Sequence, residues 1–370
     1  MPTRRYLDAN ATQPLRPAAR DAVLAAFDVT GNPSSVHASG RAARRLMEDA
    51  RETIASCFGG EPERLIFTSG GTEADALAVH AMSNGRRTII SAIEHDAVRS
   101  TAGDATVLPV APDGIVDLGA LEDQLKDSVA SLVCLMLANN ETGCIQPVQE
   151  AAALCRRFGA VLHVDAVQAA GRMDVRLDTL NAHSLAISSH KLGGPAGCGA
   201  LLLAADCPFA APLISGGGQE RGRRGGTQPV ALIAGFAAAA RDSETDDLVQ
   251  IARLRDAAEH AAAACGAVVC GDPSRRLANT TCIGLPGVAA GMQVIALDLE
   301  NIAVSAGAAC SSGKVTTSHV LQAMKLGSLA GQAIRVSLPW NATQPDIDHF
   351  AAAYARVAAR LRPALVPHPA

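Results

Sequence analysis

The sequence predicts an α/β protein built on a mostly parallel sheet that helices cover on both faces. Five short apolar runs are each followed by a polar or glycine-rich cluster and then by a helical stretch. These runs are residues 65–67, 88–90, 132–137, 161–164 and 185–187. Strands that alternate with helices favour a parallel sheet, because each helical crossover returns the chain in the same direction. Helical spacing between the runs is clear in Leu118, Leu121 and Leu125.

Length and a change in character along the chain predict two domains. The 370 residues are about two to three times the usual length of one domain. From about residue 242, a group of acidic residues leads into a helical segment, and short apolar runs then alternate with further helices. We expect a large domain over residues 13–245. A smaller domain over residues 246–370 would be joined by residues 1–12.

Composition narrows the possible partners and the compartment. The formal net charge of −4 argues against nucleic acid or an anionic membrane as the main partner. The longest apolar stretch, residues 230–240, is shorter than the roughly 20 residues of a membrane-spanning helix and predicts a buried helix. The ten cysteines show no CxxC pair or metal-ligand spacing, and no hydrophobic stretch follows the N-terminal arginines. We therefore expect a cytoplasmic protein with reduced cysteines.

Lys191 is the first residue that carries chemistry. It follows an apolar strand in the segment SSHKLGG, and a lysine that loses solvation there has a lowered pKa and a nucleophilic neutral amine. An isolated lysine is usually exposed on a loop. Ser188, Ser189 and His190 reverse that expectation, because they offer hydrogen-bond donors at a strand end, as a bound phosphate requires. Nearby glycines allow the backbone to approach a ligand closely.

Asp165 ends the apolar run of HVDAVQ, where an unpaired carboxylate is costly. A protonated pyridinium nitrogen would stabilise it, and this pairing maintains the electron-withdrawing character of pyridoxal 5′-phosphate (PLP). Gln168 is placed to reach the phenolic oxygen of the same ring. The alternatives for Asp165 are a helix N-cap or a metal site shared with His163, although no third ligand stands at a suitable spacing, so no metal is expected.

Three further strand ends carry polar residues. In TSGGTEAD, a glycine pair including Gly71 places backbone amides and Thr72 at a helix N-terminus, which is a natural phosphate site. His95 could stack on a cofactor ring or move protons, or it could be a satisfied structural histidine. Asn140 in ANNETG could equally cap a turn. Because ligands of parallel sheets bind at the carboxyl ends of the strands, we expect one site assembled from at least five of these ends.

Cys310 stands apart from the other cysteines. The segment SAGAACSSGK superficially resembles a nucleotide-binding P-loop, but its glycine spacing is wrong and Val315 replaces the required Ser or Thr. Small neighbours on a loop would leave the Cys310 thiol accessible, as a reactive cysteine requires, whereas the other nine cysteines look like packing residues.

Together these segments resemble the cysteine desulfurases of the NifS/IscS kind, within the fold-type I PLP enzymes. The resemblance runs from YLDANATQP (6–14) to IRVSLPWNATQPDID (334–348). Between these ends it includes GNPSSVHASGR, FTSGGTEAD, EHDAV, NNETG, HVDAVQAAG, SSHKLGGPAGCGAL, GGGQERGRRGGT and the SAGAACSSG loop. It implies a large PLP-binding domain and a smaller C-terminal α+β domain that carries the cysteine loop.

The resemblance also implies a reaction and a role for each residue. L-cysteine would replace Lys191 on PLP, and its sulfur would pass to Cys310, giving L-alanine and a persulfide. Lys191 and His95 would handle protons, Arg335 would bind the substrate carboxylate, and Asp165 would contact the ring nitrogen. The remaining expected cofactor and substrate contacts are Gly71, Thr72, Ser188 and His190 at the phosphate, Thr227 from a second subunit, and Asn140 and Gln168 near the ring.

The resemblance further implies a homodimer that gives sulfur to an acceptor or iron–sulfur scaffold protein. Two PLP activities compete with this interpretation: a small-amino-acid aminotransferase, which needs no mobile thiol, and a selenocysteine lyase, which could share the site. A non-catalytic sulfur-relay scaffold is the alternative from another class. The complete set of lysine, aspartate, cysteine and arginine argues against that scaffold.

Overall fold

The protein is described by a computed structural model that covers residues 4–307 and 317–362. A seven-stranded sheet forms the larger part of the molecule, in the order β2-β8-β7-β6-β5-β3-β4. Its strands are β2 (Leu65–Thr68), β3 (Arg87–Ser91), β4 (Thr106–Leu108), β5 (Ser131–Met136), β6 (Val161–Asp165), β7 (Ser184–Ser188) and β8 (Gly199–Leu203). The order and register confirm the mostly parallel sheet, since only β8 runs antiparallel to its neighbours β2 and β7.

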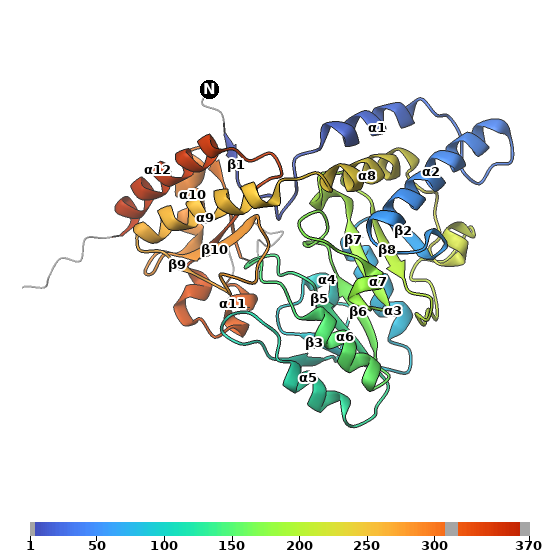
Figure 1. Cartoon of the computed structure of the whole chain (residues 1–370), viewed down its shortest axis with the longest axis horizontal. Coiled ribbons are helices and arrows are strands. Elements are labelled where there is room, and N and C mark those ends of the chain that lie inside the picture. The colour runs from blue at the N-terminus through green and yellow to red at the C-terminus, as the bar shows by residue number, and fades with distance from the viewer. Residues whose placement is uncertain (1–3, 308–316, 363–370) are drawn as a thin grey trace, which may run out of the picture.

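Helices cover both faces of this sheet, as expected (Figure 1). They are α1 (Pro17–Phe27), α2 (Ala38–Cys57), α3 (Gly71–Met82), α4 (Asp96–Arg99), α5 (Leu118–Leu125), α6 (Val148–Arg157), α7 (Leu177–Leu180) and α8 (Val230–Ser243). Alternate residues of one strand enter different cores: Val133 and Leu135 of β5 join the larger cluster, whereas Leu132 and Cys134 join the cluster under α3. A sheet buried on both faces explains why the strands read as unbroken apolar runs.

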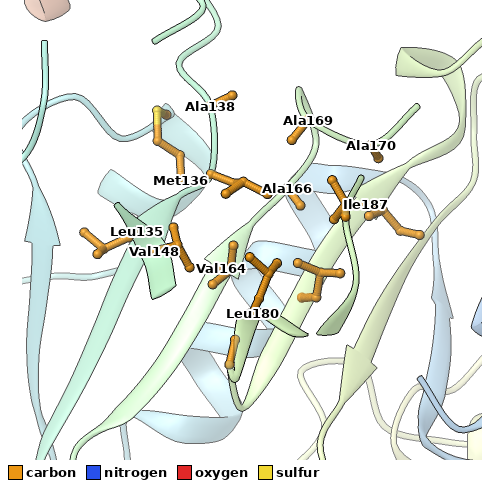
Figure 2. Packing of buried hydrophobic residues seen from close by; sticks show 14 of the residues in the cluster. Leu135, Met136, Ala138, Val148, Val164, Ala166, Ala169, Ala170, Leu180 and Ile187 are labelled. Atoms are coloured by element: carbon orange, nitrogen blue, oxygen red, sulfur yellow. The ribbon is translucent and has the colours of Figure 1, made fainter. Parts of the chain in front are cut away.

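The five predicted strands are confirmed as β2, β3, β5, β6 and β7, and the predicted buried helix at 230–240 as part of α8. One boundary differs, because β5 ends at Met136 and Leu137 lies just beyond it. Figure 2 shows Ala166, Ala169 and Ala170 beyond the strand end, in the same buried apolar cluster as Val164 of β6 and Ile187 of β7. Among the residues that the structure describes, none of the helices is long and apolar enough to span a membrane.

The C-terminal part has its own sheet and helices. Its sheet has the order β12-β13-β10-β9. The strands are β9 (Val268–Val269), β10 (Thr280–Gly284), β12 (Ser305–Ala306) and β13 (Ala333–Ser337), and the helices are α9 (Leu248–Ala264), α10 (Ala290–Leu299), α11 (His319–Ala323) and α12 (Gln344–Leu361). A separate apolar cluster joins this sheet to α9, α10 and α12 (Figure 1). This second core supports the proposed small domain, and the boundary at 245/246 stays a prediction.

The N-terminal segment belongs to both parts of the molecule. Strand β1 (Arg5–Tyr6) pairs in parallel with β11 (Ile302–Ala303) of the C-terminal part, and Asp8 forms a bridge with Ser337. Residues 10–14 then cross to the larger sheet, where the Gln13 N–H donates to the His190 carbonyl. The segment therefore passes directly over the carboxyl ends of β6 and β7, where the predicted site lies.

Candidate active site

The carboxyl ends of five strands of the larger sheet surround one pocket of about 200 Å³. Nine of the predicted site residues line it together: Gly71, Thr72, His95, Asn140, Asp165, Gln168, Ser188, His190 and Lys191. They follow β2, β3, β5, β6 and β7, so five separate strand ends contribute. Residues up to 120 positions apart in the sequence thus meet, because parallel strands end at the same edge of a sheet.

Lys191 is half-buried in this pocket and ends the short 3₁₀ turn η2 (Ser189–Lys191) after β7. Its Nζ donates to the carbonyl oxygens of Asn10 at 2.6 Å and Ala11 at 3.0 Å. Burial, with the nearby charges of Arg172 and Arg335, lowers the pKa of Lys191 to about 7. A large fraction of the amine is therefore neutral and nucleophilic near neutral pH.

Asp165 ends β6 and is buried, with its side chain facing the same pocket. Its Oδ1 accepts a hydrogen bond of 2.9 Å from the Val167 N–H. Burial raises the pKa of Asp165, while this bond and the protonated forms of His95 and Lys191 act in the opposite direction. A cationic ring nitrogen beside Asp165 would also lower the pKa of this carboxyl group and favour its ionised form.

The end of the pocket around Ser188 is suited to a phosphate. The Ser188 Oγ atom is buried and has no hydrogen-bond partner among the described residues. Gly71 opens α3, so the N–H groups of the first turn of that helix are free for an anion. A Cβ at Gly71 would lie 2.6 Å from Val167 Cγ2, so a larger residue would not fit there. The unpartnered hydroxyl and the helix N-terminus fit the phosphate group of PLP.

The two pocket histidines differ in their surroundings. His95 is exposed and caps α4, accepting at Nδ1 from the Ala97 N–H at 3.1 Å. Its neutral ring therefore carries the proton on Nε2. His190 is half-buried, with Nδ1 3.2 Å from Thr12 Oγ1, and burial lowers its pKa to about 4. His95 thus has the capping role of a structural histidine and also lines the pocket.

Two predicted residues, Arg335 and Thr227, are described but do not line the pocket, and a third falls outside the described part of the chain. Arg335 is buried on β13 and donates from Nη1 to the Asn140 carbonyl at 3.0 Å, which places it against a pocket residue. Thr227 is exposed and is not among the residues that line the pocket of its own chain. Cys310 falls in residues 308–316, outside the described part of the chain. The nine cysteines that are described are all free thiols.

Two buried residues of the site were not predicted. Asp75, on the fourth position after Gly71 in α3, lines the pocket and contacts His163 Nε2 at 3.2 Å. Burial and the charges of Asp165 and Glu94 raise the pKa of Asp75 well above its usual range. Arg172 donates to the Lys191 carbonyl and to Gln168, and burial lowers its pKa to about 9. The signal available in the sequence was the i, i+3 spacing of Asp75 from Thr72 at the start of α3. Arg172 lies in the turns after β6 and had no such signal.

His163 does not form a metal site with Asp165. Its ring lies between Asp75 and Ser184 Oγ, which is 2.8 Å from Nδ1, and burial lowers the His163 pKa to about 3. The ring is therefore neutral and hydrogen-bonded on both sides. Within residues 4–307 and 317–362, no three His, Cys, Asp or Glu side chains are grouped so that they could hold a metal ion.

The loop that carries Thr227 is anchored by a buried carboxylate. Glu220 accepts from Arg51 Nη1 at 2.8 Å, from the Phe67 N–H at 3.0 Å and from Gln228 Nε2 at 2.7 Å. Glu220 and Arg221 both adopt left-handed backbone angles, with φ of 47° and 57°. Such angles are unfavourable outside glycine and persist only where contacts impose them. The ion pair with Arg51 therefore holds a strained loop in place.

Glu220→Ala should lower the free energy of unfolding by about 3 kcal/mol, because the buried Arg51 cation loses its buried partner and keeps only the partly exposed Glu48. The exposed pair of Glu61 and Arg64 supplies a matched control, and Glu61→Ala should cost under about 1 kcal/mol. Urea unfolding followed by circular dichroism measures both. Equal midpoints for the two variants would show that the Glu220 pair does not hold the loop.

The sheet order, the lysine at the end of β7 and the aspartate at the end of β6 define the class: a fold-type I enzyme of the PLP-dependent group. The family model described as aminotransferase class-V matches residues 5–350. The chain belongs to this family and, within it, to the cysteine desulfurases of the NifS/IscS type.

Relatives and solved structures agree on this placement. A cysteine desulfurase of Cereibacter sphaeroides is 42% identical over 364 residues, covering 94% of each chain. An IscS-like cysteine desulfurase of Mycobacterium tuberculosis is 38% identical and covers 93% of each chain. The X-ray structure of a NifS-like protein from Rickettsia africae superposes with a TM-score of 0.89 at 34% identity, covering 96% of this chain and 99% of the other.

Proposed function

We propose that this enzyme uses PLP to remove the sulfur of L-cysteine, releasing L-alanine and placing the sulfur on Cys310 as a persulfide. The observation that carries the proposal is the half-buried Lys191 amine, with a pKa lowered to about 7, in one pocket with the buried Asp165 carboxylate. The unpartnered Ser188 hydroxyl at the phosphate end of that pocket supports the same assignment.

The pocket residues divide the work of holding the cofactor. Lys191 would attach it through Nζ, and Asp165 would keep a proton on its ring nitrogen. Gly71, Thr72, Ser188 and His190 would hold the phosphate together with Thr227 of the partner subunit, while Asn140 and Gln168 would contact the ring region. When bound, PLP supplies an electron-withdrawing ring that stabilises negative charge at the substrate Cα.

The residues of the chain then bind the substrate and move its protons. Arg335 would hold the α-carboxylate, a task for which a planar guanidinium is well suited. The neutral Lys191 amine would take and return the Cα proton, and the Nε2 proton of His95 is available at the pocket mouth. The Cys310 thiolate would attack the substrate sulfur, so that an S–S bond forms while the Cβ–S bond breaks. The electron pair of the broken Cβ–S bond stays on Cβ, and this carbon takes a proton and becomes the methyl group of alanine.

The proposal includes a homodimer and a protein that accepts the sulfur. A homodimer would bring Thr227 of the partner subunit to the phosphate, since Thr227 does not line the pocket of its own chain. The sulfur of a persulfide held covalently on Cys310 would be passed to a sulfur acceptor or an iron–sulfur scaffold protein in the cytoplasm.

The direct test of the proposed reaction is incubation with PLP, L-cysteine and a thiol reductant, with alanine and sulfide assayed together. Equal amounts of the two products are expected, and formation of pyruvate instead of alanine would contradict the reaction.

Attachment of PLP to the apoenzyme should accelerate as the pH rises through about 7. The reactive form of Lys191 is the neutral amine, and with a pKa of about 7 its fraction rises from about one tenth at pH 6 to about nine tenths at pH 8. The rate is followed by visible absorbance, and borohydride reduction with peptide mass spectrometry should locate the label on Lys191. A label on another lysine, or a rate that rises only near the usual lysine pKa of about 10.4, would refute this role.

A further inference from the structure

Asp8 lies against the arginine that is proposed to bind the substrate carboxylate. Its Oδ1 accepts from Arg335 Nη2 at 2.7 Å, and its Oδ2 accepts from Ser305 Oγ at 2.9 Å. The side chains of Arg335 and Asp8 are only 7% and 17% exposed, so solvent screens this pair little. Each oxygen of the carboxylate therefore has a defined partner on the small sheet.

The remaining two nitrogens of Arg335 differ in their hydrogen bonding. Nη1 donates to the Asn140 carbonyl at 3.0 Å, so two contacts from different parts of the chain set the plane of the guanidinium. The Nε atom is buried and has no hydrogen-bond partner among the described residues. A buried donor without a partner is costly, and a carboxylate is the acceptor that best satisfies it. Ser305 is directly opposite Arg335 in the register of β12 and β13, so Asp8 is itself held by the sheet that carries Arg335.

Asp8 could act on this arginine in two opposite ways. As a competing anion it would weaken substrate binding, because it already occupies part of the guanidinium. As an orienting partner it would strengthen binding, because an arginine side chain loses much rotational freedom when it is fixed. The positive charge of Arg172 beside Arg335 favours the second effect, since it offsets the repulsion between Asp8 and an arriving carboxylate.

We propose that Asp8 is a positioning residue that fixes the Arg335 guanidinium and thereby makes the site selective for substrates with an α-carboxylate. This inference rests on the proposed role of Arg335. Asp8 would act through Arg335 without touching the substrate.

The test compares inhibition by L-alanine and by ethylamine, which differ only in the α-carboxylate, against L-cysteine on the PLP-loaded enzyme. Asp8→Ala should raise the KM for L-cysteine and the inhibition constant of L-alanine about tenfold, because one hydrogen bond to a charged group is lost. The inhibition constant of ethylamine and the value of kcat should stay within about twofold. Asp8→Asn, which keeps an acceptor for Arg335 in the same place, should restore most of the L-alanine affinity.

Two comparisons separate this role from a general structural one. Asp346→Asn removes another aspartate that pairs with the N-terminal segment, through Arg5 at 2.9 Å, and should leave both inhibition constants unchanged. The double variant Asp8→Ala/Arg335→Ala should bind L-alanine no more weakly than Arg335→Ala alone, because Asp8 acts only through Arg335.

Parental or tighter L-alanine binding by Asp8→Ala, with weakened binding by Arg335→Ala, would overturn the inference and leave the proposed role of Arg335 standing. Unchanged L-alanine binding by Arg335→Ala would overturn both. If Asp8→Ala does not fold, Ser305→Ala removes the other partner of Asp8, and we expect a smaller loss of the same sign, about threefold. Unchanged L-alanine binding by a folded Ser305→Ala variant would then count against the inference.

Discussion

Cys310→Ser is expected to keep PLP bound and to reduce sulfur transfer by at least about 100-fold, because a serine hydroxyl is scarcely ionised at neutral pH whereas a thiol is partly ionised. Cofactor attachment and substrate binding do not use this thiol, so the change in visible absorbance on adding L-cysteine should survive. The measurement is alanine formation, together with mass spectrometry of the parent enzyme after L-cysteine without a reductant. One extra sulfur atom should then lie on the peptide containing Cys310.

Cys57→Ser is the matched control for this prediction. Cys57 is half-buried, and burial together with Glu244 raises its thiol pKa to about 12. Its thiolate is therefore nearly absent at neutral pH, and the variant should form alanine at the parental rate. Parental alanine formation by Cys310→Ser, or an added sulfur on a different cysteine, would refute the persulfide mechanism and leave the PLP assignment in place.

The second large effect is expected at Asp165. Asp165→Asn should still bind PLP, because the substituted oxygen can keep the hydrogen bond from the Val167 N–H. The neutral amide cannot hold a proton on the ring nitrogen by its charge, so activity should fall by about 100- to 1,000-fold, as for other losses of preorganised electrostatic groups. Alanine formation and bound PLP are measured on the same preparation. Activity within a few-fold of the parent would contradict this role.

Asp75→Asn provides a control that faces the same pocket. Burial and the neighbouring carboxylates of Asp165 and Glu94 raise the Asp75 pKa well above its usual range, which favours the neutral form of its side chain. An amide at this position changes no charge and can donate to His163 Nε2, which Asp75 contacts at 3.2 Å. We therefore expect activity within about threefold of the parent. A loss as large as that of Asp165→Asn would mean that Asp75 carries charge in the working enzyme.

Local patterns were sufficient to predict five of the seven strands of the larger sheet and most of the pocket, whereas β4 and β8 were not predicted. An apolar run such as residues 161–164 is buried wherever it packs, and the polar residue that follows it, Asp165, must then lie at the end of a strand. Parallel strands end at one edge, so Lys191, Asp165 and Thr72 were placed in one pocket before any contact between them was known. The local pattern marked Cys310 as an accessible thiol, but its role as the sulfur acceptor came from the resemblance to a family. The role of Arg335 came from that resemblance alone.

Only the tertiary structure revealed the residues that act through other residues. Asp75 lies within α3, and its burial depends on how that helix packs against β6. Arg335 and Asp8 are 327 positions apart and meet because the N-terminal segment pairs alongside β13, where Asp8 forms a bridge with Ser337. Sequence periodicity reports which side of an element is buried, but not which distant element covers it. The partner of a buried charge is therefore decided by the register and packing of separate elements.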